Sequence, residues 1–333
     1  MHTVGVSERG LPRDVSTALS AATAHYVHGE TMEAIARRLG VSRSTVSRLL
    51  KQARESGLVE IRIRSPLEAP RLLAQGLKKT YGVSALPVPV PEDASDVERL
   101  DLVAAAAADL IGARIGSHRT VGIAWGSTIA AVSRHLSPKP TTGTVFVQLN
   151  GSGNTRTTGL GYASDILGRF GRAFSAQVQQ FPVPAFFDDP ATKTALWRER
   201  SMRRILDVQD AMDTVVFSVG AAESSVPSHV YSGGYLEPAD LDELATEGVV
   251  GDVATVFYRA DGSSEDIALN ARATGPALSR LARVRRRICV VAGASKLTSI
   301  RGALAAGLVT DLVIDEPTAR ALLAVGGHRI RRE

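Results

Sequence analysis

The hydrophobic positions near the start of the chain follow the period of amphipathic helices. Ile35 and Leu39 lie one helical turn apart, and Gly40 after them can adopt the left-handed conformation that ends a helix. Four apolar residues then recur at the spacing of a buried helix face: Val46, Leu49, Leu50 and Ala53. Thr31 and Ser42 each precede a helical run, where a hydroxyl accepts a backbone N–H hydrogen bond. The pattern predicts two capped helices joined by a tight turn.

The opposite face of the second helix carries hydrogen-bond donors. Its polar residues are Arg43, Ser44, Thr45, Ser47, Arg48 and Lys51. A helix with one apolar face and one donor face, reached by a tight turn, is typical of a helix-turn-helix, whose second helix enters the major groove. Arg43 and Arg48 can contact guanine edges or phosphates, while Lys51 and the helix starts at Thr31 and Ser42 suit phosphates. We predict a double-stranded DNA interface here; the alternative is a protein-interaction module with a solvated polar face.

The segments around this pair extend the predicted DNA-binding domain. A preceding helix, from about Val15 to His28, would complete a three-helix core through Leu19, Ala22 and Tyr26. From Gly57, the stretch GLVEIRIRSP alternates apolar with charged residues, which indicates a basic strand like the wing of winged helix-turn-helix domains. We therefore assign residues 1–66 to the DNA-binding domain.

Beyond residue 84 the apolar pattern changes to short Val-rich runs separated by helical segments. The runs are ALPVPV, TVGIAW, TVFVQLN, TVVFSVG, RRICVVAG and DLVIDE. Continuous apolar strands are buried on both faces, so the pattern predicts an α/β fold with a doubly wound, mostly parallel sheet. We assign residues 67–84 to a linker helix and 85–333 to a ligand-binding and oligomerisation domain.

Three strand-to-helix turns carry small or polar residues suited to a ligand. Ligands of parallel sheets bind beyond the carboxyl ends of strands, often at helix N-termini. The candidate residues in these turns are Gly126, Ser127, Thr128, Asn150, Gly151, Ser152, Gly153 and Lys296. If the turns meet at one sheet edge, their N–H groups, hydroxyls and one cation can hold phosphate or sugar oxygens. Trp125 next to the first turn suits either the floor of a sugar site or the core.

Charge and composition limit the function classes. The net charge is +5, and residues 1–66 hold ten basic and six acidic residues, so most of the excess lies in the predicted DNA-binding domain. The single cysteine, Cys289, excludes an internal disulfide framework, and the seven histidines have no metal-ligand spacing. We therefore predict no metal and no cofactor. No apolar stretch is long enough to span a membrane, and we expect a cytoplasmic protein.

Several of these segments resemble a known family. The stretch TMEAIARRLGVSRSTVSRLLKQARESGLVEIRI is similar to the DNA-binding part of the SorC family of bacterial sugar-responsive transcription regulators. VGIAWGST, LNGSG, FPVPAFF, GVVGDVATVFYRADG and VVAGASKLTSIRGALAAGLVTDLVIDEPTARALL resemble its sugar-binding domain, and the similarity extends over about residues 15–325. The family's effector domain is similar in fold to ribose-phosphate isomerase and glucosamine-phosphate deaminase, but acts as a sensor.

The resemblance also implies roles for individual residues. Gly126, Ser127 and Thr128, with the backbone of residues 150–153, would hold the effector's phosphate or terminal hydroxyls. Asp252 would face sugar hydroxyls, and Lys296 would reach the effector near its anionic group. Asn150 stands where some members have an arginine, which leaves a free sugar or polyol open beside a sugar phosphate.

Three functions compete on this reading. The first is a transcription regulator, such as a repressor, that acts as a homodimer or homotetramer on operator DNA under the control of a sugar, polyol or sugar-phosphate effector. The second is a sugar-phosphate isomerase or deaminase with an accessory DNA-binding domain. That chemistry needs an acid and a base, and no second carboxylate or histidine beside Asp252 stands out in the glycine-rich turns, so we predict no catalytic residue. The third is an assembly platform without a ligand.

Overall fold

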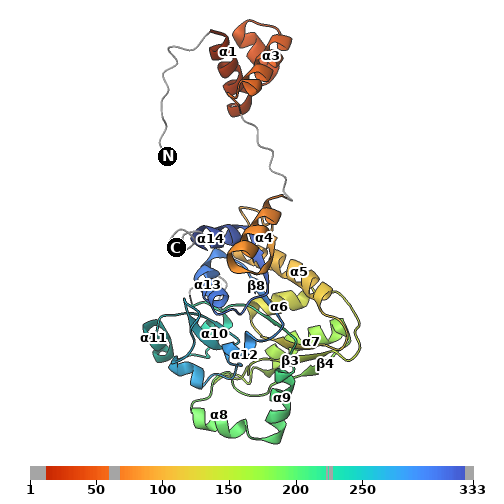
Figure 1. The fold of residues 1–333 in the computed structure, drawn as a ribbon, viewed down its shortest axis with the longest axis vertical. Coiled ribbons are helices and arrows are strands. Elements are labelled where there is room, and N and C mark those ends of the chain that lie inside the picture. The colour runs from red at the N-terminus through yellow and green to blue at the C-terminus, as the bar shows by residue number, and fades with distance from the viewer. Residues whose placement is uncertain (1–12, 60–67, 223, 225–227, 327–333) are drawn as a thin grey trace. The chain divides into compact units, whose positions relative to one another are not determined.

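The computed structural model describes residues 13–59, 68–222, 224 and 228–326. The chain divides into two compact units, Met1–Ser65 and Pro66–Glu333, and each is described by itself (Figure 1). The division of the chain into residues 1–66, 67–84 and 85–333 stays a prediction.

The first unit is a small helical domain. It contains α1 (Arg13–Ala22), the π-helix η1 (Thr23–Val27), α2 (Met32–Leu39) and α3 (Arg43–Glu55). Thr31 Oγ1 accepts a hydrogen bond from Ala34 N at 3.2 Å, and Ser42 Oγ accepts one from Thr45 N at 3.1 Å. Gly40 ends α2 with a φ of 66°. Both predicted N-caps and the predicted left-handed helix end are confirmed.

The core of this unit is made mostly of small residues. Its buried side chains are Ala18, Ala21, Ala22, Ala24, Ile35, Ala36, Val46, Leu50 and Ala53. The prediction of Tyr26 in this core is wrong, because the Tyr26 side chain is 40% exposed. Tyr26 lies within the π-helix, where His28 N is bonded to Thr23 O, so the 3.6-residue period on which the prediction rested does not hold there. The predicted basic strand falls mainly on residues 60–67, outside the described residues.

A parallel sheet of seven strands organises the second unit. The strands are β1 (Ser84–Val88), β2 (Thr120–Ile123), β3 (Val145–Gln148), β4 (Gln177–Gln179), β5 (Thr214–Phe217), β8 (Arg286–Val291) and β9 (Asp311–Asp315). Their order is β1-β9-β8-β5-β2-β3-β4, and every neighbouring pair is parallel. From β2 the chain moves outward through β3 to β4, and from β5 it moves the other way. The strand order therefore reverses between β2 and β5.

Helices cover both faces of this sheet, as the α/β prediction requires. One face carries α5 (Asp96–Arg114), α6 (Ser127–Arg134) and α7 (Leu160–Phe174), which lie side by side in Figure 1. The other carries α4 (Glu68–Tyr81), α9 (Arg200–Asp210), α13 (Leu297–Ala305) and α14 (Glu316–Gly326). Successive strand residues serve opposite faces: on β8, Ile288 and Cys289 belong to different core clusters.

The helix expected as a linker, α4, packs within the second unit. Leu77 on α4 is fully buried, and the Tyr81 hydroxyl donates a hydrogen bond to Leu322 O at 3.0 Å. Smaller elements complete the unit: α8 (Pro190–Leu196), α10 (His229–Ser232), α11 (Pro238–Thr246), α12 (Leu278–Leu281), η2 (Ala268–Ala271) and η3 (Ala294–Lys296). Strands β6 (Val249–Val253) and β7 (Val256–Arg259) form an antiparallel hairpin apart from the main sheet. Within the part of the chain that the structure describes, no helix is long and apolar enough to cross a membrane.

We expect Gly122→Ala to destabilise the second unit. A Cβ at Gly122 would lie 2.2 Å from Met212 Sδ and 2.6 Å from a methyl carbon of Leu149, so the core would have to shift. Such overpacking costs about 1–3 kcal/mol of unfolding free energy. Gly112→Ala is the matched control, because a Cβ there meets no atom within 4 Å and alanine favours the helix. Urea unfolding of both variants tests this; equal stability would contradict it.

Candidate functional site

The polar face of α3 is the first candidate surface. Ser44, Ser47 and Arg48 are exposed on it, as the sequence predicts. Arg43 lies 3.7 Å from Glu33, and Lys51 lies 3.6 Å from Glu55; both are exposed ion pairs of the kind that contributes little to stability. The donors on this face are therefore available to a partner.

Three other predicted DNA-contacting residues are engaged in the local structure. Thr31 and Ser42 are the N-caps already described, and Ser42 Oγ also lies 2.8 Å from Ser44 Oγ and 2.9 Å from Thr45 Oγ1. Thr45 is half-buried. These hydroxyls fix the start of α3, and the exposed residues further along the helix present the longer side chains.

The second candidate is a cleft at the carboxyl ends of the central strands. It is small and partly open to solvent. Its walls come from the segments after β2, β3, β5 and β8, together with α10 and the β6–β7 hairpin. This is the point where the strand order reverses, which is where open α/β sheets bind ligands. The structure thus brings the three predicted turns to one place.

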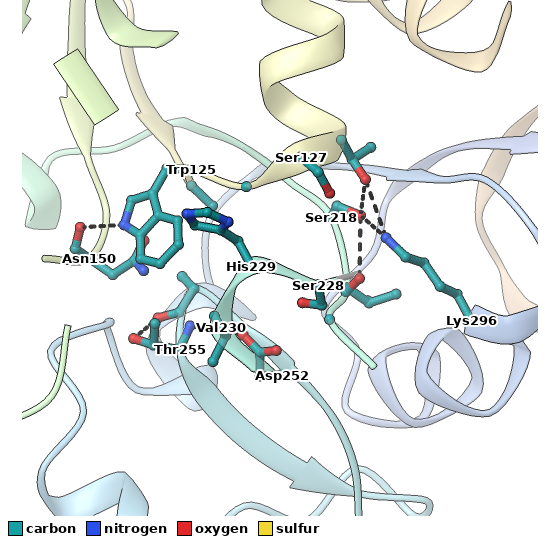
Figure 2. A pocket seen from close by; sticks show the side chains of 16 residues that line it. Trp125, Ser127, Asn150, Ser218, Ser228, His229, Val230, Asp252, Thr255 and Lys296 are labelled. Atoms are coloured by element: carbon teal, nitrogen blue, oxygen red, sulfur yellow. Dashed lines mark hydrogen bonds between the residues drawn. The ribbon is translucent and has the colours of Figure 1, made fainter. Parts of the chain in front are cut away.

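One side of the cleft is built around Lys296, on the turn after β8. The side chain is 5% exposed, and its Nζ donates hydrogen bonds to Thr128 Oγ1 at 3.2 Å and Ser218 Oγ at 3.3 Å. Burial lowers the pKa of the Lys296 amine to about 8. Lys296, Ser127 and Ser218 lie together in Figure 2, and Ser127 begins α6, so its backbone contributes the positive end of a helix dipole.

Asp252 on β6 supplies the opposite charge. Its Oδ2 accepts a hydrogen bond from Thr255 N at 3.0 Å, while the buried Oδ1 has no hydrogen-bond partner among the described residues. Burial raises the pKa of the Asp252 carboxyl to about 6. Gly220 leaves room for this carboxylate, since a Cβ there would lie 1.9 Å from Oδ1. A buried oxygen without a partner is costly, and such groups are often found at functional sites.

The turn after Asp252 holds this carboxylate with an unusual backbone. Ala254 and Thr255 have φ values of 49° and 69°, in the left-handed region that a β-branched residue rarely adopts. The Thr255 hydroxyl donates a hydrogen bond to Ala254 O at 2.5 Å. Backbone strain of this kind is often found at functional sites.

Asn150 and Trp125 form the side of the cleft away from Lys296. The Trp125 indole Nε1 donates to Asn150 O at 3.1 Å and to Gly151 O at 2.9 Å, which fixes the turn after β3 (Figure 2). Asn150 Oδ1 is a second buried acceptor without a partner among the described residues. Trp125 is 6% exposed and stacks on Tyr235 with ring centroids 5.1 Å apart. The indole is therefore both a core side chain and a wall of the cleft.

The remaining residues of the predicted LNGSG site lie outside this cleft. Gly151 packs against the backbone of the segment after β4, where a Cβ would lie 2.1 Å from Pro184 O. Ser152 is buried, and Gly153 faces a neighbouring hollow lined by Phe186 and Tyr235. Of the predicted ligand-binding residues, the cleft is lined by Gly126, Ser127, Thr128, Asn150, Asp252 and Lys296.

The lining residues that the sequence analysis missed include Ser218, Gly220, Ser228 and His229. Ser218 and Gly220 directly follow β5, so the strand-end rule applied to TVVFSVG would have found them. His229, at the start of α10, gives no such signal, because only tertiary packing places its imidazole 5.9 Å from the Trp125 ring. Burial lowers the pKa of His229 below its ordinary value, which keeps the imidazole neutral at pH 7.

The cleft combines donors and acceptors. Lys296 and the start of α6 offer donors and positive charge, and Asp252 and Asn150 offer acceptors. In Figure 2 the imidazole of His229 lies between Asn150 and Lys296, and Asp252 lies below it. In the described part of the chain, no group of three His, Cys, Asp or Glu side chains could hold a metal ion. The arrangement suits a small polyhydroxylated molecule with an electron-rich group at one end.

Comparisons with known proteins give a consistent result. Residues 65–324 match the family model Sugar-bind, described as a "Putative sugar-binding domain", and residues 13–60 match a homeodomain-like domain. The chain is 30% identical over 308 residues to the deoxyribonucleoside regulator of Bacillus subtilis strain 168, covering 92% of this chain and 96% of that protein. It is 27% identical to the erythritol catabolism regulatory protein EryD of Brucella abortus, covering 93% and 97%.

Solved structures agree with this result. A domain described as a possible sugar-binding transcriptional regulator from Arthrobacter aurescens TC1 is 52% identical with a TM-score of 0.73, covering 78% of this chain and 100% of that one. The full-length sorbitol operon regulator SorC from Klebsiella pneumoniae, 23% identical, has a TM-score of 0.68 over 94% of this chain and 100% of that one, which supports the fold.

The charge on Asp252 should reduce stability when no ligand is bound. Its pKa of about 6 lies above the ordinary value near 4, so the folded state binds more protons than the unfolded state between these values. Stability then falls as the pH rises from about 4 to 6, by up to about 3 kcal/mol. Asp252→Asn removes this pH-dependent loss of stability, because asparagine has no charged form. We expect the ligand-free variant to be more stable than wild type at pH 7 and equal to it near pH 4; urea unfolding showing no such difference would contradict the assignment.

Proposed function

This chain belongs to the SorC family of sugar-binding transcription regulators, and we propose that the cleft around Lys296 and Asp252 is its effector site. The protein binds DNA through its helix-turn-helix and regulates transcription in response to a sugar-type effector. The observation that carries the site is the pair of buried acceptors, Asp252 Oδ1 and Asn150 Oδ1, in a cleft that also holds the buried cation of Lys296. Neither oxygen has a hydrogen-bond partner among the described residues.

The chemistry of the cleft supports a polyhydroxylated effector. Asp252 and Asn150 would accept hydrogen bonds from hydroxyls, and the Trp125 and His229 rings would pack against carbon atoms of the ligand. Lys296, Thr128 and the start of α6 would hold an electron-rich end, either a phosphate or terminal hydroxyls. We propose a sugar, polyol or sugar phosphate. The named relatives include a deoxyribonucleoside regulator and an erythritol catabolism regulatory protein.

We further propose that α3 reads the operator through Ser44, Ser47 and Arg48, and that the protein acts as a homodimer or homotetramer. A single helix reads only a few base pairs. An operator with two symmetric half-sites is therefore bound by two such helices, which favours an even oligomer. Effector binding would change operator affinity if the effector binds two arrangements of the oligomer with different affinities.

We infer that the site binds its ligand without converting it. The named relatives are regulators, and this supports a sensor. A thermal-shift screen of sugars, polyols and their phosphates would find the effector, since a ligand that binds the folded state raises the melting temperature. NMR of the incubated hits would then detect turnover. Stabilisation without turnover is the expected result; conversion of a hit would favour an isomerase or deaminase.

Arg48→Ala should weaken operator binding about 10- to 100-fold, because a guanidinium contact to a base edge contributes about 1–3 kcal/mol. Arg54→Ala is the matched control: Arg54 is an exposed arginine of the same helix, six residues further and on another side. Gel-shift titration with operator DNA measures both variants. Equal effects of the two would point to general charge attraction rather than a recognition face.

Lys296→Met should abolish the effector response and leave operator affinity unchanged, because Nζ is the cation buried in the cleft. Lys193→Met is the control: Lys193 is also partly buried, but its Nζ donates to the carbonyl oxygens of Ala271 and Ala273, outside the cleft. The readout is the effector concentration that releases half of the bound operator. A wild-type response in the Lys296 variant would place the effector elsewhere.

A further inference from the structure

Two ion pairs join helix α5 to strand β9, one at each end. Arg99, in the first turn of α5, lies 3.2 Å from Asp315 at the end of β9. Arg114, at the end of α5, lies 3.6 Å from Asp311 at the start of β9. The pairs have the same chemistry on the same two elements. They differ in surroundings: the Arg99 and Asp315 side chains are 15% and 0% exposed, while Arg114 and Asp311 are 41% and 9% exposed.

Asp315 uses both carboxylate oxygens for several hydrogen bonds. Its Oδ1 accepts from the Arg99 guanidinium, from Thr318 N at 3.0 Å and from Thr318 Oγ1 at 2.8 Å. Its Oδ2 accepts from Gly293 N at 2.7 Å. A fully buried carboxylate is tolerated only with such partners. Asp315 therefore connects α5 and α14 to the turn that follows β8.

That turn leads directly to the lysine of the cleft. Gly293 O accepts a hydrogen bond from Lys296 N at 3.2 Å, and η3 between them is a single turn of helix. Gly293 has a φ of 93°, so this backbone is held in a conformation unusual for other residues. The Lys296 backbone is thus fixed through Asp315, while its Nζ is held by Thr128 and Ser218.

We propose that Arg99 and Asp315 are positioning residues that hold the turn Gly293–Lys296 so that Nζ of Lys296 faces the cleft. This inference rests on the proposed function of the cleft as the effector site. Neither residue lines the cleft, and both act through the backbone of Gly293. Without the Asp315 carboxylate, the buried N–H of Gly293 would lose its acceptor, and the turn would relax to find another.

The ion pair at the other end of α5 and β9 allows a test of the alternative, in which both pairs only fasten α5 to the sheet. Asp311 pairs with Arg114 and with Arg286 at the start of β8, away from the cleft. If the ion pairs only fasten α5 to the sheet, breaking the Arg99–Asp315 pair should leave the surroundings of Lys296 unchanged, as breaking the Arg114–Asp311 pair does. If Arg99 and Asp315 position Lys296, only that pair should affect the lysine.

The experiment uses the full-length protein with Asp315→Asn, Arg99→Met and, as the control, Arg114→Met. Asparagine has one acceptor oxygen and one NH₂ group, so either Gly293 N–H or Thr318 N–H would face a donor. The chain has six lysines, so NMR of protein labelled with ¹³C in its lysines can follow the titration of Lys296 without any effector, assigned with Lys296→Met. Effector release of operator DNA is measured in parallel.

In Asp315→Asn and Arg99→Met we expect the pKa of Lys296 to rise from about 8 towards the ordinary 10.5, because water reaches a less buried amine. The effector concentration for half release should rise about tenfold, the effect of about 1.4 kcal/mol from a lost buried hydrogen bond, with operator affinity unchanged. Arg99→Lys keeps the positive charge, so its Lys296 pKa and its effector response should lie closer to those of wild type than the values of Arg99→Met. If Asp315→Asn does not fold, the result for Arg99→Met alone tests the proposal.

The proposal is overturned if the pKa of Lys296 in Asp315→Asn and Arg99→Met equals that of wild type. It is also overturned if Arg114→Met shifts this pKa by the same amount. Failure of the effector-site assignment would look different: Lys296→Met would respond to effector normally, while the titration would still report whether Arg99 and Asp315 position the lysine.

Discussion

Parallel pairing of β2 with β3 on one side and β5 on the other is the constraint on which the rest of this structure depends. In parallel strands all carboxyl ends meet at one edge of the sheet, so the segments after β2, β3, β5 and β8 must converge there. The chain leaves β2 and β5 in opposite directions, and the divergence opens a cleft. Ser127, Asn150, Ser218 and Lys296 are carried on segments whose positions follow from this pairing, and Asp252 and His229 are added from the β6–β7 hairpin and α10.

The cleft concentrates groups that do not favour folding. A buried lysine, a buried carboxylate and a buried amide oxygen each lose hydration, and the last two have acceptor atoms without partners among the described residues. The surrounding sheet compensates for these costs with continuous apolar strands and two core clusters. A ligand that supplies hydroxyl donors would satisfy the unpartnered acceptors only when it is bound. This is a physical basis for coupling occupancy of the cleft to the state of the protein.

The polar groups around the cleft are supported by a second layer. Trp125 fixes the turn of Asn150, Thr255 and Gly220 shape the surroundings of Asp252, and Asp315 holds the turn that leads to Lys296. Each supporting contact is a hydrogen bond or a close packing contact involving the backbone. Binding sites hold their geometry through such contacts, since a side chain is only as well placed as the backbone that carries it.

The sequence by itself determined the features that depend on short-range chemistry. Helix caps at Thr31 and Ser42, the apolar face of α3, the Val-rich strands and the small residues at strand ends all follow from contacts within a few residues, and the structure contains each of them. The fold class followed as well, because alternating buried strands and helices have few ways to pack.

Tertiary structure alone decided the features that depend on distant segments. It left Gly151 packed on the segment after β4 and brought His229 beside Trp125. Arg99 and Asp315 are 216 residues apart in the chain, so no local pattern could pair them. The physical reason is that periodicity and capping depend on interactions between residues close together in the chain. Which residues form a site depends instead on which distant segments the packed sheet brings within hydrogen-bond distance of one another.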